Sequence, residues 1–306
     1  MRIVSLIASA TEIVSALGFQ NQIVGRSHEC DYPESILTLP ACSEPKIDIH
    51  TSSFEIDRQV KEVVAQSLSV YRVDADKLKG LRPDVIVTQD HCEVCAVSLK
   101  DVEQAVCDWM ENRPKIVSLR PESMEDIWRN IRQVADALDA QPKGEQLVQR
   151  LQSRIDAIVR KTGKVDQKIS VACIEWIDPL MAGGNWIPEM VHLLKADCVF
   201  GEPGKHSPWM TWEELVAKDP DVIITLPCGF DIKRTLEEMP LLSQRKEWAG
   251  LKAVRTDRVY VTDGNQYFNR PGPRLVESFE IMSEILYPEI YQFGYEKTGW
   301  IKYKSS

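Results

Sequence analysis

Short apolar runs alternate with amphipathic segments along most of the chain. The run at residues 2–7 is a continuous apolar stretch of strand length, whereas the segment 121–138 repeats apolar residues at helical spacing. Strands that alternate with helices of about ten residues are typical of parallel βαβ units. The pattern predicts strands at 2–7, 22–27, 69–73, 81–88, 115–119, 168–175, 220–225 and 258–262, and helices at 9–18, 56–66, 98–110, 121–138, 142–161, 188–195, 212–218 and 274–286.

The segment 142–161 near the middle of the chain predicts the longest helix. Pro142 suits a first helical turn, and Gly163 follows the end of the pattern. A helix of this length is a rod of roughly 30 Å. The helix pattern alone is equally compatible with a crossover helix inside one large sheet and with a spacer between two lobes.

A short internal repeat favours two lobes. Residues 83–88 read PDVIVT and residues 220–225 read PDVIIT, one on each side of the central helix. We therefore expect an α/β protein with two Rossmann-like lobes, each with a parallel sheet, joined by one long backbone helix. The expected parts are a lobe at 1–120, connecting helices at 121–165, a second lobe at 166–290 and a tail at 291–306.

Composition and charge narrow the classes of partner. The 306 residues carry a formal charge of −9, which argues against nucleic acid or an anionic membrane as the main partner. Apolar residues make up 43% of the chain, but no run is long enough to predict insertion into a membrane. No export signal is recognised after Met1, so the sequence predicts a cytoplasmic location, or a periplasmic one if a leader was removed.

Polar and sulfur-bearing side chains follow the predicted strands of the first lobe. Because ligands of open α/β sheets bind at the carboxyl ends of the strands, these residues are candidates for ligand contact: His28, Glu29, Gln89 and Asp90. Cys30, Cys92, Cys95 and, in the second lobe, Cys228 are candidate metal ligands, and the cluster of His28, Cys30, Cys92 and Cys95 suits zinc or iron. Small apolar cysteines that pack a loop explain the same pattern equally well.

Aromatic side chains gather in the predicted loops of the second lobe. Several lie beside glycine and proline, where a flat apolar ligand would find a rigid wall. Arg270 is expected either to pair with a ligand carboxylate or phosphate, or to form a salt bridge within the protein. The candidate ligand-binding residues here are Trp186, Trp209, Phe230, Tyr267, Phe268 and Arg270.

Four stretches resemble the helical-backbone metal receptor family, the class III periplasmic binding proteins for cobalamin, haem and iron chelates. They are RIVSLIASATEIVSALGFQNQIVGRSHECDYP at 2–33, VYRVDADKLKGLRPDVIVTQDHCEVCA at 70–96, GGNWIPEMVHLLKADCVFGEPGKHS at 183–207 and DGNQYFNRPGPRLVES at 263–278. The resemblance implies two lobes on one long helix, a shallow cleft between them, and docking on an ABC permease if the protein is exported. The HECD and CEVCAVS motifs are similar to those of a leaderless, cobalamin-receptor-like branch.

Two functions remain open at this point. The first is non-catalytic binding of a cobalamin-like corrinoid or related iron chelate in the cleft between the lobes. The alternative is a cytosolic metal-binding or thiol-redox protein that uses His28, Cys30, Cys92 and Cys95. No Ser-His-Asp order, nucleophile elbow or Walker loop appears in the sequence, so we do not expect an enzyme of those classes.

Overall fold

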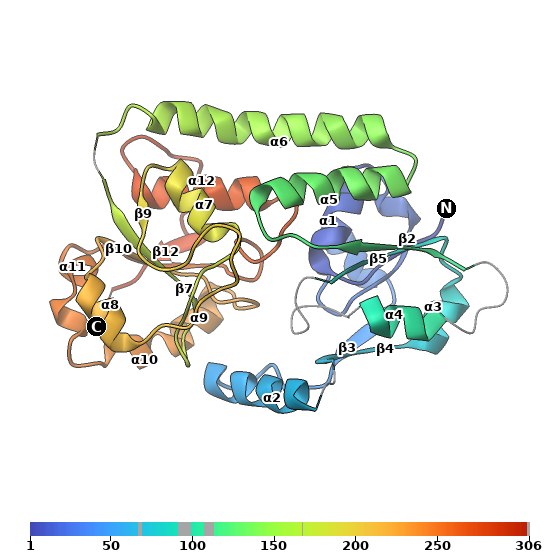
Figure 1. Ribbon diagram of the computed structural model, residues 1–306, viewed down its shortest axis with the longest axis horizontal. Coiled ribbons are helices and arrows are strands. Elements are labelled where there is room, and N and C mark those ends of the chain that lie inside the picture. Colours follow the sequence, from blue (N-terminus) through green and yellow to red (C-terminus); the bar gives the residue numbers. More distant parts are fainter. Residues whose placement is uncertain (67–68, 91–98, 107–112, 167, 305–306) are drawn as a thin grey trace. The chain divides into compact units, whose positions relative to one another are not determined.

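The computed structural model describes residues 1–306 except 67–68, 91–98, 107–112, 167 and 305–306 (Figure 1). The chain divides into two compact units. The N-terminal unit comprises residues 1–51, 55–121 and 125–150, and the C-terminal unit comprises 52–54, 122–124 and 151–306. The expected fold class, an α/β protein with two lobes and parallel sheets, is confirmed.

The N-terminal unit is built on a parallel sheet of strand order β2-β1-β5-β6. Its strands are β1 (Ile3–Ser5), β2 (Ile23–Arg26), β5 (Val85–Gln89) and β6 (Lys115–Leu119), and a separate antiparallel pair is formed by β3 (Ser43–Pro45) and β4 (Tyr71–Val73). Its helices are α1 (Ala8–Ala16), α2 (Ser53–Ala65), α3 (Ala75–Leu81), α4 (Leu99–Val106) and α5 (Met124–Ala137), with short 3-10 turns at Gln20–Gln22 and Glu34–Thr38. β5 is buried along its whole length, as a central parallel strand requires.

The C-terminal unit is built on a mixed sheet of order β12-β11-β10-β7-β8, and β9 also pairs with β7. The strands are β7 (Ser170–Trp176), β8 (Met181–Ala182), β9 (Asp197–Cys198), β10 (Val222–Thr225), β11 (Val259–Thr262) and β12 (Trp300–Lys302). The helices are α7 (Ile187–Leu193), α8 (Trp212–Lys218), α9 (Ile232–Glu238), α10 (Pro240–Ser243), α11 (Lys252–Arg255) and α12 (Leu275–Leu286), with a 3-10 turn at Trp248–Gly250. The pairs β7·β10 and β10·β11 are parallel, whereas β8 and β12 run antiparallel to their neighbours.

The long helix α6 (Gln141–Thr162) agrees closely with the segment predicted from the sequence. It contributes residues up to Arg150 to the N-terminal unit and residues from Leu151 to the C-terminal unit. Within the N-terminal unit it lies against α5 at Gly144, where an added Cβ would stand 2.5 Å from the Cβ of Ala135. No helix among the residues that the structure describes is long and apolar enough to cross a membrane.

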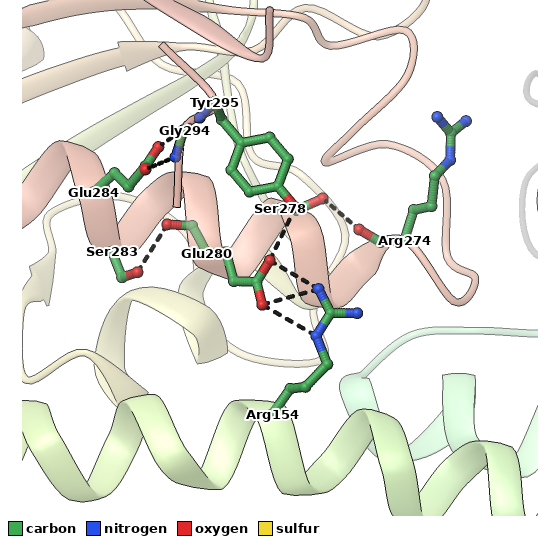
Figure 2. A network of polar contacts seen from close by, with 8 residues as sticks. All are labelled: Arg154, Arg274, Ser278, Glu280, Ser283, Glu284, Gly294 and Tyr295. Carbon is green, nitrogen blue, oxygen red and sulfur yellow. Dashed lines mark hydrogen bonds and ion pairs between the residues drawn. The ribbon is translucent and has the colours of Figure 1, made fainter. Parts of the chain in front are cut away.

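Two buried carboxylates of α12 attach both α6 and the C-terminal tail to the C-terminal unit (Figure 2). Glu280 accepts hydrogen bonds from the Arg154 guanidinium at 2.8–3.1 Å and from the Tyr295 hydroxyl at 2.9 Å. Glu284 accepts from the backbone N–H groups of Gly294 and Tyr295, at 2.6 and 3.2 Å, and from the Trp300 indole at 3.0 Å. The pKa of the Tyr295 hydroxyl is raised by burial and by neighbouring Glu280, so this hydroxyl remains a donor.

Some sequence predictions differ from the observed elements. The segment 258–262 is not the last strand, because β12 in the tail pairs antiparallel with β11. The helix predicted at 9–18 is α1 at Ala8–Ala16, one residue earlier at its start and two residues shorter at its end. The helix α9 was not predicted, although Asp231 caps it by accepting from the Arg234 N–H.

Removing the Arg154 guanidinium tests the α12 network. We expect Arg154→Ala to lower the free energy of unfolding by roughly 1–3 kcal/mol, between the values for exposed and buried ion pairs, because it removes the charged partner of buried Glu280. Arg150→Ala, on an exposed position of the same helix, should change it by less than about 0.5 kcal/mol. The measurement is the urea midpoint followed by tryptophan fluorescence, and equal midpoints for the two variants would contradict the expectation.

Candidate functional site

The loop after β2 is held at the carboxyl edge of the N-terminal sheet, meaning the edge where its parallel strands end. The Arg26 guanidinium donates to the carbonyl oxygens of Leu39, Ser27 and His28 at 3.2, 2.9 and 3.3 Å. Ser27 is itself buried and its N–H donates to the Ser5 carbonyl at 2.8 Å. The side chain of His28 therefore projects from an anchored backbone.

His28 is half-buried and contacts two other side chains. Its Nδ1 lies 2.9 Å from the Ser43 hydroxyl, and its backbone N–H donates to the same oxygen at 3.2 Å. Its ring centroid lies 5.1 Å from that of Tyr71. Burial, and secondly the charge of Arg26, lower the pKa of His28 to about 4, so the imidazole is neutral near pH 7.

Glu29 and Cys30 point to different surroundings. The Tyr71 hydroxyl donates to Glu29 Oε1 at 2.9 Å, which orients this carboxylate. Cys30 is fully buried: its sulfur accepts from the Thr11 hydroxyl at 3.0 Å and faces the Ser5 carbonyl at 3.8 Å. The Cys30 thiol is therefore directed into the N-terminal unit.

The last residue of strand β5, Gln89, is buried, and Asp90, which follows it, is exposed. Cys92 and Cys95 lie outside the described residues. Among the residues that are described, no group of three or more histidine, cysteine or acidic side chains converges as a metal site. Cys228 belongs to the C-terminal unit and is exposed. The zinc or iron cluster thus stays a prediction.

At the carboxyl edge of the C-terminal sheet, three large side chains lie in a row across antiparallel strands. Trp176 at the end of β7 pairs with Met181 of β8, and Met181 forms a bridge with Trp209. Residues directly opposite each other in antiparallel strands point to the same face, which places Met181 and Trp209 together. The β7–β8 register shifts between Ile174 and Trp176, so Trp176 is instead placed by its ring contact with Phe230. Trp209 is 55% exposed, which is unusual for so large an apolar side chain and marks a candidate contact surface.

Phe230 extends this row from the loop after β10. Its ring centroid lies 5.2 Å from that of Trp176, and the Arg234 guanidinium lies 4.5 Å from it. Arg234 also donates to Glu238 at 2.6 Å, so its charge is balanced within the protein. We call Trp209, Met181, Trp176 and Phe230, with Arg234, the aromatic row.

Three other candidate residues are buried beneath this edge. The Trp186 indole donates to the Phe268 carbonyl at 2.7 Å, and the Phe268 N–H donates to the Ser278 hydroxyl at 2.9 Å. These bonds hold Phe268 at a positive φ of 60°. Arg270 is 6% exposed and donates to Asn265 at 3.1 Å. Direct ligand contact by Trp186, Phe268 and Arg270 stays a prediction, and their hydrogen bonds indicate that they support the loop.

Tyr267 lies in the same loop and is half-buried, in contrast to Phe268 beside it. Its ring centroid lies 6.0 Å from that of Tyr295, in an edge-on arrangement, and the Arg274 guanidinium lies 5.6 Å from it. The loop thus presents Tyr267 partly to solvent while it buries its other aromatic side chain.

Comparison with known proteins identifies the family. Residues 3–266 match the periplasmic binding protein family. The chain belongs to this family. It is 25% identical to the ABC transporter substrate-binding lipoprotein YvrC of Bacillus subtilis, over 95% of this chain and 81% of that protein. It is 21% identical to a vitamin B12-binding protein of Vibrio parahaemolyticus, over 90% of this chain and 86% of that one.

The fold of this periplasmic binding protein also matches solved structures. A periplasmic haem-binding protein from Pseudomonas aeruginosa superposes with a TM-score of 0.74 and 18% identity, over 99% of this chain and 98% of that one. These relatives are named as binding proteins; the Bacillus relative is named a lipoprotein and the Pseudomonas protein a periplasmic one. The cytoplasmic location expected from the sequence finds no support in them and stays a prediction.

The structure adds residues to the candidate site that the sequence does not indicate. Ser43 of β3 contacts His28 in the loop after β2, and no sequence signal links these two residues. The sequence does contain a signal for Arg234. Asp231 is a typical N-cap residue, so a helix could have been predicted after it, and Arg234 follows Phe230 by one helical turn. The sequence places Trp176 among the aromatic residues of the second lobe without marking it as a ligand contact.

Alkylation kinetics test the placement of the cysteines. Burial raises the pKa of the Cys42 and Cys198 thiols to about 11, and that of Cys173 well above its ordinary value. At pH 8, a thiol of pKa 11 is ionised in only about one molecule per thousand, and the thiolate is the reactive form. We therefore expect iodoacetamide to modify exposed Cys228 before Cys42, Cys173 and Cys198.

The readout is peptide mass spectrometry over a time course in buffer and in urea. In urea the four thiols should react at similar rates, which controls for peptide recovery. Modification of Cys42 as fast as that of Cys228 in buffer would contradict the assignment.

Proposed function

We propose that this chain is a non-catalytic substrate-binding protein for a corrinoid-like metal chelate. The observation that carries the proposal is the aromatic row, in which exposed Trp209 continues into Met181, Trp176 and Phe230. A row of apolar side chains, three of them flat rings, suits one face of a macrocycle, because contact with it removes a large apolar area from water. The relatives named for vitamin B12 and haem bind ligands of this shape.

Charge favours a corrinoid over haem. Haem carries two propionate carboxylates, whereas the amide side chains of cobalamin are neutral. At the aromatic row, the guanidinium of Arg234 is already paired with Glu238, and the whole chain has a formal charge of −9. A dianionic ligand would therefore find little net positive charge, and its desolvation would be poorly compensated.

The proposed role includes a transport partner. The Bacillus relative is an ABC transporter substrate-binding protein, so an ABC permease is the partner we propose if this chain is exported. Contact of one ligand with the carboxyl edges of both units stays a prediction. The alternative, a thiol-redox or metal protein using Cys92 and Cys95, also stays a prediction, because both residues lie outside the described part of the chain.

Retention of a coloured ligand tests the proposal. The purified protein is mixed with aquacobalamin and, in a separate sample, with haemin, and each mixture is desalted before its visible spectrum is recorded. We expect cobalamin to stay with the protein at a stoichiometry near one. Retention of haemin alone would mean that the ligand is a porphyrin and not a corrinoid. A colourless protein in both samples would overturn the proposal for macrocyclic chelates.

Truncation of Trp209 tests the aromatic row. Since Trp209 is exposed, Trp209→Ala should leave the unfolding midpoint nearly unchanged, but it should weaken cobalamin binding by about 1–2 kcal/mol, or roughly 5- to 30-fold. The matched control is Phe293→Ala, which removes another exposed aromatic side chain of the same unit. Binding is measured by titration of absorbance. Equal affinities for the two variants would remove Trp209 from the binding surface.

A further inference from the structure

A short segment at the start of α2, residues 52–54, belongs to the C-terminal unit, although the chain on either side of it belongs to the N-terminal unit. Its central residue, Ser53, is the first residue of α2 and is fully buried. Its neighbours Ser52 and Phe54 are exposed, and so are residues 48–50, which lead to it. The segment therefore places one buried residue in the C-terminal unit between exposed stretches of chain.

Hydrogen bonds of Ser53 join this segment to the aromatic row. The Ser53 backbone N–H donates to Glu238 Oε1 at 3.1 Å, and its hydroxyl donates to Oε2 at 2.8 Å. Its carbonyl oxygen accepts from the Trp176 indole N–H at 3.2 Å. Glu238 is 4% exposed and also accepts from Arg234 at 2.6 Å. Both donors of Ser53 thus help to compensate a buried carboxylate, as does the Arg234 guanidinium.

These contacts surround Phe230. Its ring lies beside Trp176 on one side and beside the Arg234 guanidinium on another, and Ser53 joins Trp176 to the pair formed by Arg234 and Glu238. Phe230 is only 5% exposed, so a flat ligand cannot stack on it while these contacts persist.

Residues 52–54 are the part of this arrangement that can leave most readily. Trp176 is the last residue of β7, and Arg234 and Glu238 lie in α9, so their movement would disrupt a strand or a helix of the unit. Ser53 stands at the very start of its helix, where the first N–H groups have no partner within the helix. If the segment leaves, Arg234 stays with Glu238, and the carboxylate keeps a charged partner.

We propose that residues 52–54 are a removable cover of the aromatic row, and that a chelate displaces them in order to stack on Phe230. The inference rests on the proposed function and concerns the C-terminal unit alone. It reconciles a contact role for Phe230 with its burial, because the cover keeps this apolar ring out of water until the ligand does so. The observed affinity is then the intrinsic affinity reduced by the fraction of molecules whose row is uncovered.

The first test measures the cover without any ligand. Ser53→Pro removes both donors to Glu238, and proline is tolerated at the first position of a helix. Hydroxyl-radical footprinting, read by peptide mass spectrometry, reports the exposure of individual side chains. We expect labelling of Phe230 to rise roughly threefold or more in Ser53→Pro, because a locally opened segment no longer protects the ring.

The control for this test is Ser35→Ala, which changes an exposed serine of the N-terminal unit and should leave the labelling of Phe230 at the wild-type level. Equal labelling of Phe230 in Ser53→Pro and the wild type would overturn the inference, because residues 52–54 would not be what buries the ring. Far-ultraviolet circular dichroism of each variant establishes that folded proteins are compared.

The second test is the affinity for aquacobalamin, measured by titration of absorbance. Ser53→Ala removes a hydrogen bond to a charged group that only the covered form makes, so it should bind about tenfold more tightly than the wild type. Ser35→Ala should bind as the wild type does. Equal or weaker binding by Ser53→Ala would identify the segment as a fixed part of the surface and would overturn the inference.

Hydrogen exchange in the complex gives a third readout, whose sign is unusual for a binding site. Bound aquacobalamin should slow exchange in peptides that contain residues 226–230. The Ser53 amide, in contrast, loses its acceptor Glu238 when the cover is displaced, so it should exchange faster in the complex than in the free protein. Slower exchange at Ser53 in the complex would contradict displacement.

Failure of the proposed function is distinguishable from failure of the cover. If the wild type retains neither aquacobalamin nor haemin, the proposed function is overturned and displacement by a chelate with it, whereas footprinting still decides whether residues 52–54 cover Phe230. If the wild type retains aquacobalamin but neither the footprint of Ser53→Pro nor the exchange at Ser53 changes, the cover alone is overturned and chelate binding stands.

Discussion

The structure of the C-terminal unit depends on the hydrogen bonds that compensate the buried carboxylates of α12. Glu280 and Glu284 are 6% and 4% exposed, and a charge so placed requires several donors. The donors come from parts of the chain far apart in sequence. They are Arg154 of α6 and Tyr295 of the tail, which Figure 2 shows, and also Trp300 of the tail. The same requirement therefore fixes the second half of α6 and the course of the tail that ends in β12.

The loops after β10 and β11 are packed against each other at close range. A side chain at Gly264 would collide with the carbonyl oxygen of Pro227. Close backbone packing makes the loops rigid, so Trp176 and Phe230 are presented in fixed positions.

The sequence was sufficient for the features that arise from local periodicity. The helix α6 and the strand β6 were predicted nearly to the residue, because their apolar spacing and end signals are local. The tail strand β12 was missed, since it is short and its pairing with β11 depends on residues distant in sequence. For the same reason, the sequence named His28 as a candidate but gave no indication of Ser43. Arg270 lies in a polar stretch that fits a ligand-facing guanidinium and an internal one equally well, and its burial is decided by tertiary packing, which single-sequence patterns do not encode.

The charge of the aromatic row limits which ligands suit it. The C-terminal unit presents there an apolar face whose guanidinium is already paired with Glu238. Among the described residues, this row does not provide the dense array of cations that an anionic siderophore would require. A flat chelate of low net charge would therefore suit this surface without leaving a buried charge unpaired.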